Sequence, residues 1–111
     1  MNDKYERQMK KGLLDLLVLK LLELEPKYGY QLISELKEKS NGIFLLKEGT
    51  LYPILYRLEE EGLVASQWSE ANGKRPPRKY YVITKAGEGT LVQLKQIWLQ
   101  MQQAAARIME E

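Results

Sequence analysis

KEGTLYPILYRLEEEGLVASQWSEANGKRPPRKYYVIT, residues 47–84, decides the fold, because its hydrophobic period changes part-way along. Up to Gly62 the apolar residues recur at helical spacing and form one inward stripe, Leu51, Ile54, Leu55 and Leu58. Residues 63–68 and 78–84 are rich in Val, Ile, Tyr, Thr and Trp, which favours strands. Asn72-Gly73 and Pro76-Pro77 in residues 69–77 are typical of a turn. The stretch therefore predicts a helix followed by a β-hairpin with a long tip.

Pro53 leaves the start of this helix open between two alternatives. If Thr50 caps the helix, Pro53 lies in the first turn, where its missing N–H costs little. If the helix begins near Lys47, Pro53 removes one hydrogen bond from the interior and bends the helix.

Three further helices are predicted outside this stretch, at residues 5–24, 28–39 and 85–109. Pro26 ends the first of them, and Asn41-Gly42 closes the second. The fold class is mainly α with a small antiparallel β-hairpin. It corresponds to a winged helix-turn-helix, residues 1–84, followed by a long C-terminal dimerisation helix, residues 85–111.

The composition excludes most familiar chemistry. The 111 residues contain no Cys and no His, so disulfides, thiolate nucleophiles, imidazole bases and the usual zinc ligands are absent. We therefore predict no catalytic site, no metal site and no cofactor. The apolar run of residues 13–24 carries three charges and is too short to cross a bilayer, and no export signal follows it. We expect a soluble, cytoplasmic protein without a membrane partner.

Positive charge is concentrated in the hairpin. Residues 71–85 contain five Lys or Arg and no acid, whereas the rest of the chain is net acidic. Such a cationic loop releases counterions from a phosphate backbone when it binds nucleic acid. The alternative is a solvated loop that protects a sheet edge from aggregation. If the loop binds double-stranded DNA, the predicted contacts in the hairpin are Lys74, Arg75, Arg78 and Lys79.

The outer face of the helix before the hairpin offers hydroxyl, aromatic and guanidinium groups that bind phosphates or base edges. The three glutamates at its end, residues 59–61, direct its N-terminal half toward the duplex. For each tyrosine, packing is the alternative. The predicted DNA contacts here, with one Tyr from the preceding helix, are Tyr30, Lys47, Thr50, Tyr52, Pro53, Tyr56 and Arg57.

The last helix carries a heptad seam, which predicts pairing with a second copy of the chain. The apolar face of the first helix joins the same interface; the alternative is a helix folded back on its own domain. Trp98, with Met101, marks a slot for a flat aromatic effector, or else Trp98 simply fills the interface. The predicted homodimer residues are Leu13, Leu17, Leu91, Leu94, Trp98, Met101, Ala105 and Ile108.

The run 49–59, GTLYPILYRLE, followed by Gly62-Leu63 and by residues 78–84, RKYYVIT, resembles the PadR family of bacterial transcriptional regulators. The single C-terminal helix resembles that of the compact subfamily. The resemblance implies a homodimeric winged-helix repressor, released by a small phenolic or drug-like compound. It also implies a Trp98 pair that sandwiches flat ligands at the dimer centre. The Pro76-Pro77 pair departs from the family's more Gly-rich wings.

The leading hypothesis is thus a sequence-specific DNA-binding repressor. The alternative from another class is a winged-helix protein-interaction module, which would be expected to have a neutral or acidic wing.

Overall fold

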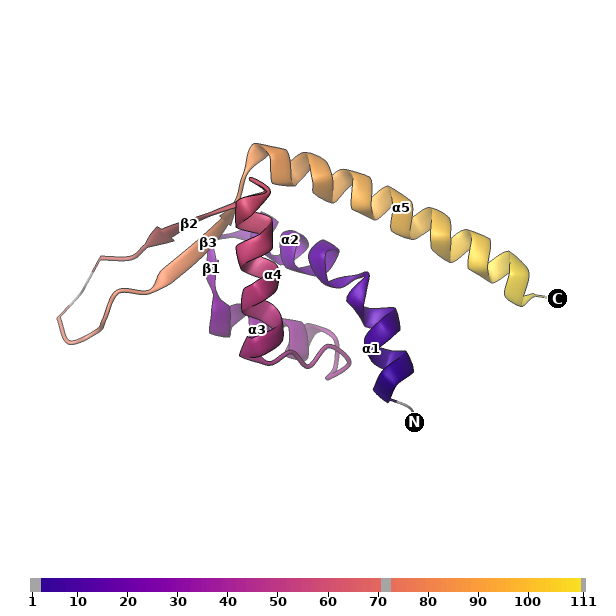
Figure 1. Cartoon of the computed structure of the whole chain (residues 1–111), viewed down its shortest axis with the longest axis horizontal. Helices are drawn as coiled ribbons and strands as arrows, with labels where there is room; N and C mark the ends of the chain where they lie inside the picture. Colours follow the sequence, from indigo (N-terminus) through magenta and orange to yellow (C-terminus); the bar gives the residue numbers. More distant parts are fainter. Residues whose placement is uncertain (1–2, 71–72, 111) are drawn as a thin grey trace.

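The computed structural model describes residues 3–70 and 73–110, and helices dominate it (Figure 1). Four helices precede a hairpin, and a long helix follows it. In chain order the elements are α1 (Asp3–Lys11), α2 (Leu14–Leu24), β1 (Lys27–Tyr28), α3 (Gly29–Lys39), α4 (Glu48–Glu60), β2 (Val64–Trp68), β3 (Lys79–Ile83) and α5 (Lys85–Met109). The predicted fold class, a winged helix with a C-terminal helix, is confirmed. Within the described residues no helix is long and apolar enough to cross a membrane.

The single N-terminal helix predicted for residues 5–24 is wrong, since the chain forms two helices with a break at Gly12-Leu13. Glycine is the least favourable helix residue after proline, and at this point the Leu13 amide bonds back three residues to Lys10 at 2.9 Å. The break separates two kinds of helix. α2 buries six of its eleven residues, whereas α1 buries none and lies at the edge of the molecule.

The observed start of α4 decides between the two positions of Pro53 that the sequence left open. The helix begins at Glu48 with Lys47 as its N-cap, so Thr50 is not the cap and Pro53 lies inside the helix. Pro53 therefore removes the bond that its amide would make to the carbonyl of Gly49. Pro53 is exposed, so the core packing on the opposite face of α4 is retained through Leu51, Leu55 and Leu58.

The hairpin strands β2 and β3 lie where the sequence predicts them, and a third strand, β1, was missed. The sheet order is β1-β3-β2, and both pairings are antiparallel. β1 is only two residues long, too short to show alternation. Its Lys27 is buried but paired, with Nζ 3.0 Å from Glu35 and 3.3 Å from Glu25, which offsets part of the cost of burying the charge.

The core lies between α2, α3, α4 and the sheet. Its largest fully buried side chains include Tyr81 of β3 and Leu91 of α5. α5 thus begins inside the core, packs on α2, and then leaves the body as a free helix toward the C-terminus (Figure 1). The division into domains at residue 84 stays a prediction. Leu91, near the beginning of α5, packs in the same core as the preceding elements.

The start of α5 is fixed by Thr84. Its hydroxyl donates to the carbonyl of Gly62 at 2.7 Å and accepts from the amide of Gly87 at 3.0 Å. Gly87 is buried so close to the carbonyl oxygen of Leu63 that a methyl group there would overlap it. Gly89, two residues on, faces open space.

We expect Gly87→Ala to destabilise the fold by about 2–4 kcal/mol, because the added methyl group must displace backbone at the base of the hairpin. Gly89→Ala is the matched control and should stabilise the fold by about 0.5–1 kcal/mol through helix propensity. Urea unfolding followed by circular dichroism measures both. Equal effects of the two substitutions would contradict the packing at Gly87.

Candidate nucleic-acid interface

The outward face of α4 presents a small polar surface near the N-terminus of the helix. Lys47, Thr50 and Pro53 are exposed there, opposite the buried leucine stripe. Tyr30, at the start of α3, is also exposed, and a hydrogen bond with Glu48 raises the pKa of its hydroxyl. The structure therefore brings these predicted residues to one region, at the beginning of α3 and α4.

Arg57 is less free than the sequence suggested. Its guanidinium donates to Asp15 of α2 at 2.6 Å and lies 3.5 Å from Glu61. The hydrogen bond to Asp15 is the main cause of a raised pKa for Arg57. Arg57 thus joins α4 to α2, and it must exchange a carboxylate for any phosphate or base that it binds.

The two tyrosines of α4 have different surroundings. Tyr52 is half-buried against the core, and its hydroxyl lies over Gly29 so closely that no Cβ would fit there. Burial raises the pKa of Tyr52. Tyr56 is 54% exposed, with its ring centroid 6.0 Å from that of Tyr52. The packing alternative therefore describes Tyr52, and Tyr56 is the tyrosine that is accessible to a ligand.

Lys79 lies where the hairpin meets α4, in a cluster that the sequence did not predict. Its Nζ is 5.4 Å from the ring centroid of Tyr56 and 5.3 Å from that of Tyr81, and 3.9 Å from Glu59. Ser66 of β2 donates to the other oxygen of Glu59 at 2.5 Å. These contacts cross three elements, which no spacing within one element reveals. They tie the hairpin to α4 and occupy Lys79.

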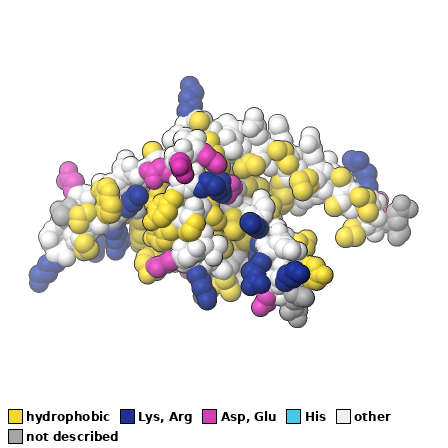
Figure 2. All heavy atoms as spheres, viewed as in Figure 1, with side chains coloured by type: hydrophobic (Ala, Val, Ile, Leu, Met, Phe, Trp, Pro, Cys, Tyr) yellow, Lys and Arg dark blue, Asp and Glu magenta, His cyan; other side chains and the backbone are white. Residues whose placement is uncertain are grey.

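The tip of the hairpin carries the accessible cations. Lys74, Arg75 and Arg78 are exposed, and blue side chains mark the arm that projects from the body in Figure 2. Arg78 stacks on Tyr28 at 4.6 Å, and its backbone pairs with Ser69, whose amide donates to the Arg78 carbonyl at 2.8 Å. Of the predicted Asn72-Gly73 turn, Asn72 lies outside the described residues, and Gly73 has a positive φ of 61°.

The heptad residues divide into two groups along α5. Leu91 is only 1% exposed in the core of its own chain and is therefore not available to a partner, while Leu94, Leu13 and Leu17 are half-buried against the same core. Further along, Trp98 is 39% exposed, Met101 and Ile108 are more open, and Ala105 is exposed as well. A groove of about 150 Å³ between the N-terminal helices and α5 contains Leu13, Leu94, Trp98 and Met101 in its wall.

Within residues 3–70 and 73–110, no three acidic side chains come together as a potential metal site. The geometry is instead a helix end with polar groups, beside a cationic arm on a small sheet.

Residues 18–93 match the model of the transcriptional regulator PadR-like family. The chain belongs to this family. The resemblance predicted from the TLYP and KYY motifs is therefore confirmed. The general function of this PadR-like protein is transcriptional regulation.

Solved structures agree with that assignment. A PadR family transcriptional regulator from Eggerthella lenta is 34% identical with a TM-score of 0.86, covering 97% of this chain and 91% of the other. A PadR-like transcription factor from Bacteroides fragilis is 37% identical with a TM-score of 0.77, covering 95% and 98%. By sequence alone, the chain is also similar to an uncharacterized protein of Lysinibacillus sphaericus. The two are 32% identical over 102 residues, which span 90% of this chain and 91% of that protein.

The hydroxyl of Tyr81 gives this regulator a measurable alkaline signature. It is buried and has no hydrogen-bond partner among the described residues, and burial, with smaller effects of Tyr56 and Glu59, raises the pKa of Tyr81 to about 12. In the unfolded chain a tyrosine has a pKa of about 10.

Because the folded state holds this proton more tightly, stability should fall as the pH rises from about 10 to about 12. Tyr81→Phe removes the titrating group and the unpaired hydroxyl. We expect it to be neutral or stabilising by up to about 1 kcal/mol at pH 7, and to flatten the alkaline decline. Urea unfolding at a series of pH values measures this, and a variant that loses stability as steeply as the natural protein would refute the assignment.

Proposed function

We propose that this PadR-like regulator is a repressor that binds double-stranded DNA as a homodimer and is released by a flat aromatic effector. The observation that carries the proposal is the exposed N-terminal face of α4 beside an arm with accessible cations. The resemblance to compact PadR regulators supports the repressor role. We place its action in the cytoplasm, with the DNA that it binds.

The distribution of charge supports binding to DNA through this face. Lys74 and Arg75 at the tip of the arm, with Lys47 at the start of α4, carry positive charge toward the phosphates. Thr50, exposed in the first turn of α4, offers a hydroxyl to a base edge. The acidic end of α4, residues 59–61, lies at the opposite end of the helix and would face away from the duplex.

Arg75→Ala should weaken binding to all duplexes. It should also reduce the magnitude of the slope of log affinity against log salt concentration by about 1 for each hairpin arm that contacts a phosphate. Thr50→Ala should instead change the relative affinity for different sites. Band shifts with DNA from upstream of the protein's own gene, repeated across salt concentrations, measure both. Lys37→Ala, which removes an exposed cation from α3, is the control and should leave both quantities unchanged. Failure of the natural protein to bind duplex at low salt would reject the proposal.

The free end of α5 supports a dimer. Trp98, Met101 and Ile108 are exposed on a helix that continues well past the core of its own chain (Figures 1 and 2). A second copy would bury these residues by a seam of the kind that heptads form. Two-fold pairing would also present two α4 helices to half-sites one turn of DNA apart, roughly 34 Å.

The same region supports an effector site. The groove beside Trp98 and Met101 is small in one subunit, about 150 Å³. In a dimer the second Trp98 would close it from the other side and leave a flat aromatic slot. A planar ligand bound there would alter the seam, and through α5 the distance between the two α4 helices.

Met101→Glu, made in a Trp68→Phe background so that Trp98 alone fluoresces, tests both parts. Met101 is 64% exposed, so one chain should fold normally, but the new charge would be buried in the seam. We expect sedimentation equilibrium to show a monomer, and flat aromatic compounds to lose their effect on fluorescence. A parent protein that sediments as a monomer at micromolar concentration would refute the dimer. A parent whose fluorescence is unchanged by the compounds would refute the effector site.

A further inference from the structure

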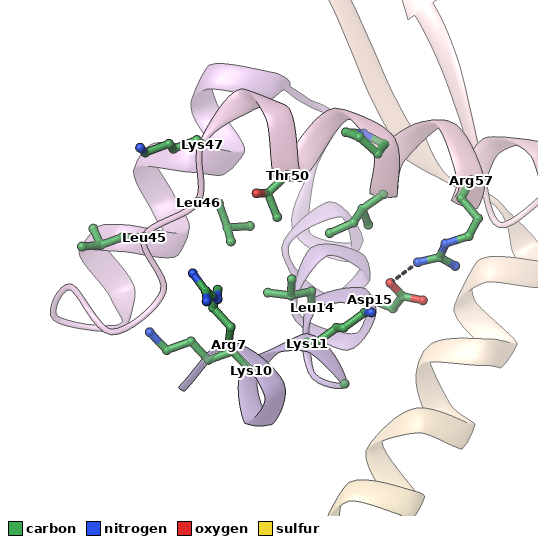
Figure 3. A pocket seen from close by; sticks show the side chains of 13 residues that line it. Arg7, Lys10, Lys11, Leu14, Asp15, Leu45, Leu46, Lys47, Thr50 and Arg57 are labelled. Atoms are coloured by element: carbon green, nitrogen blue, oxygen red, sulfur yellow. Dashed lines mark hydrogen bonds and ion pairs between the residues drawn. The ribbon is translucent and has the colours of Figure 1, made fainter. Parts of the chain in front are cut away.

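A second hollow lies between α1 and α4, and it shares Gly12 with the groove at Trp98. Its volume is about 910 Å³, within the range of small-molecule sites. Figure 3 shows its walls: Arg7, Lys10 and Lys11 come from α1, and Thr50 and Arg57 come from α4. The connection before α4 closes the hollow on a third side.

The floor of this hollow is apolar. Leu14 at the start of α2, Leu46 of the connection and Ile54 of α4 contribute to it. In Figure 3 the side chains of Leu14 and Leu46 point into the space between the helices. Leu45 is 64% exposed beside them. An apolar floor of this kind gains free energy by covering the hydrocarbon body of a ligand.

The rim is cationic, and acidic side chains neutralise only part of its positive charge. Five Lys or Arg side chains and one carboxylate, Asp15, line the hollow, and Asp15 is already bonded to Arg57 at 2.6 Å. Lys10 is paired with Glu6 at 3.4 Å. Within the parts of the chain that the structure describes, Arg7 and Lys11 form no ion pair. An anionic head would bind such donors by charge-assisted hydrogen bonds.

α1 itself lacks the packing that usually holds a helix. None of its residues is buried, and Lys10 Nζ lies 5.8 Å from the ring centroid of Phe44 in the connection. A ligand in the hollow would supply apolar and ionic contacts between α1 and α4.

We propose that this hollow binds an organic anion with an apolar body and a carboxylate, sulfonate or phosphate head, and that the bound anion competes with duplex DNA. A DNA duplex is too wide to enter the hollow, and its charged backbone would gain no free energy from contact with the apolar floor. A small amphiphile therefore fits the lining better. Competition follows because Thr50, Pro53 and Arg57 belong both to the wall and to the face of α4 proposed to contact DNA. The competition rests on the proposed function, whereas binding of the anion does not.

The test uses 4-phenylbutyrate as the anion and 4-phenylbutan-1-ol as its neutral match, titrated calorimetrically without DNA. We expect the acid to bind saturably and the alcohol to bind at least about tenfold more weakly. Arg7→Gln with Lys11→Gln should weaken the acid about tenfold and leave the alcohol unchanged. Glutamine preserves helix propensity, so α1 should persist. Lys37→Gln with Lys85→Gln removes the same charge outside the hollow and should change neither affinity.

Equal affinity for acid and alcohol, no binding at millimolar concentration, or unchanged binding by the Arg7/Lys11 variant would overturn the proposal. Loss of affinity for DNA alone in the Arg7/Lys11 variant would overturn it too, because the cations of α1 would then bind the phosphates of DNA and not the small anion. If circular dichroism shows that the double variant loses α1, Lys47→Gln in the connection gives the same comparison. Band shifts with added 4-phenylbutyrate test competition. Absence of any DNA binding would reject the proposed function, while calorimetry would still decide the site.

Discussion

The junction at Thr84 determines how the functional parts are placed relative to one another. Its hydroxyl joins the turn after α4 to the first turn of α5, and its amide bonds to the carbonyl of Leu63 at 3.1 Å. The hairpin base, the end of α4 and the beginning of α5 therefore meet within a few residues. Gly87 makes the approach possible, because any side chain there would overlap backbone. The direction in which α5 leaves the body is fixed relative to α4 and the arm.

Much of the fold could be predicted from local sequence patterns. α5 and the two hairpin strands follow from heptad spacing and alternation, and Lys85–Met109 agrees with the predicted range. The break at Gly12 was missed because the leucines around it continue at helical spacing, and a single glycine does not always end a helix. β1 was missed because two residues carry no period. Its existence depends on pairing with β3, which is a tertiary event.

The predicted interface residues show the same division. Lys74, Arg75 and Thr50 are exposed as their sequence context suggests. Arg57 and Lys79 are instead engaged by Asp15 and by a Tyr–Glu cluster, which are distant in the sequence. Sequence patterns identify which residues carry charge, but only the fold shows which charges are already neutralised. The hollow at α1 illustrates the converse, since cations dispersed between residues 7 and 57 come together only where the folded chain places α1 opposite α4.

The free part of α5 also constrains how the length of this chain can vary. Each residue in a helix turns the following side chains by about 100° and advances them by about 1.5 Å. One residue inserted between Leu91, which is held in the core, and Trp98 would swing the exposed apolar row away from its original side. About seven inserted residues would nearly restore its direction while moving it roughly a nanometre outward. This connecting stretch should therefore accept replacements more readily than insertions or deletions.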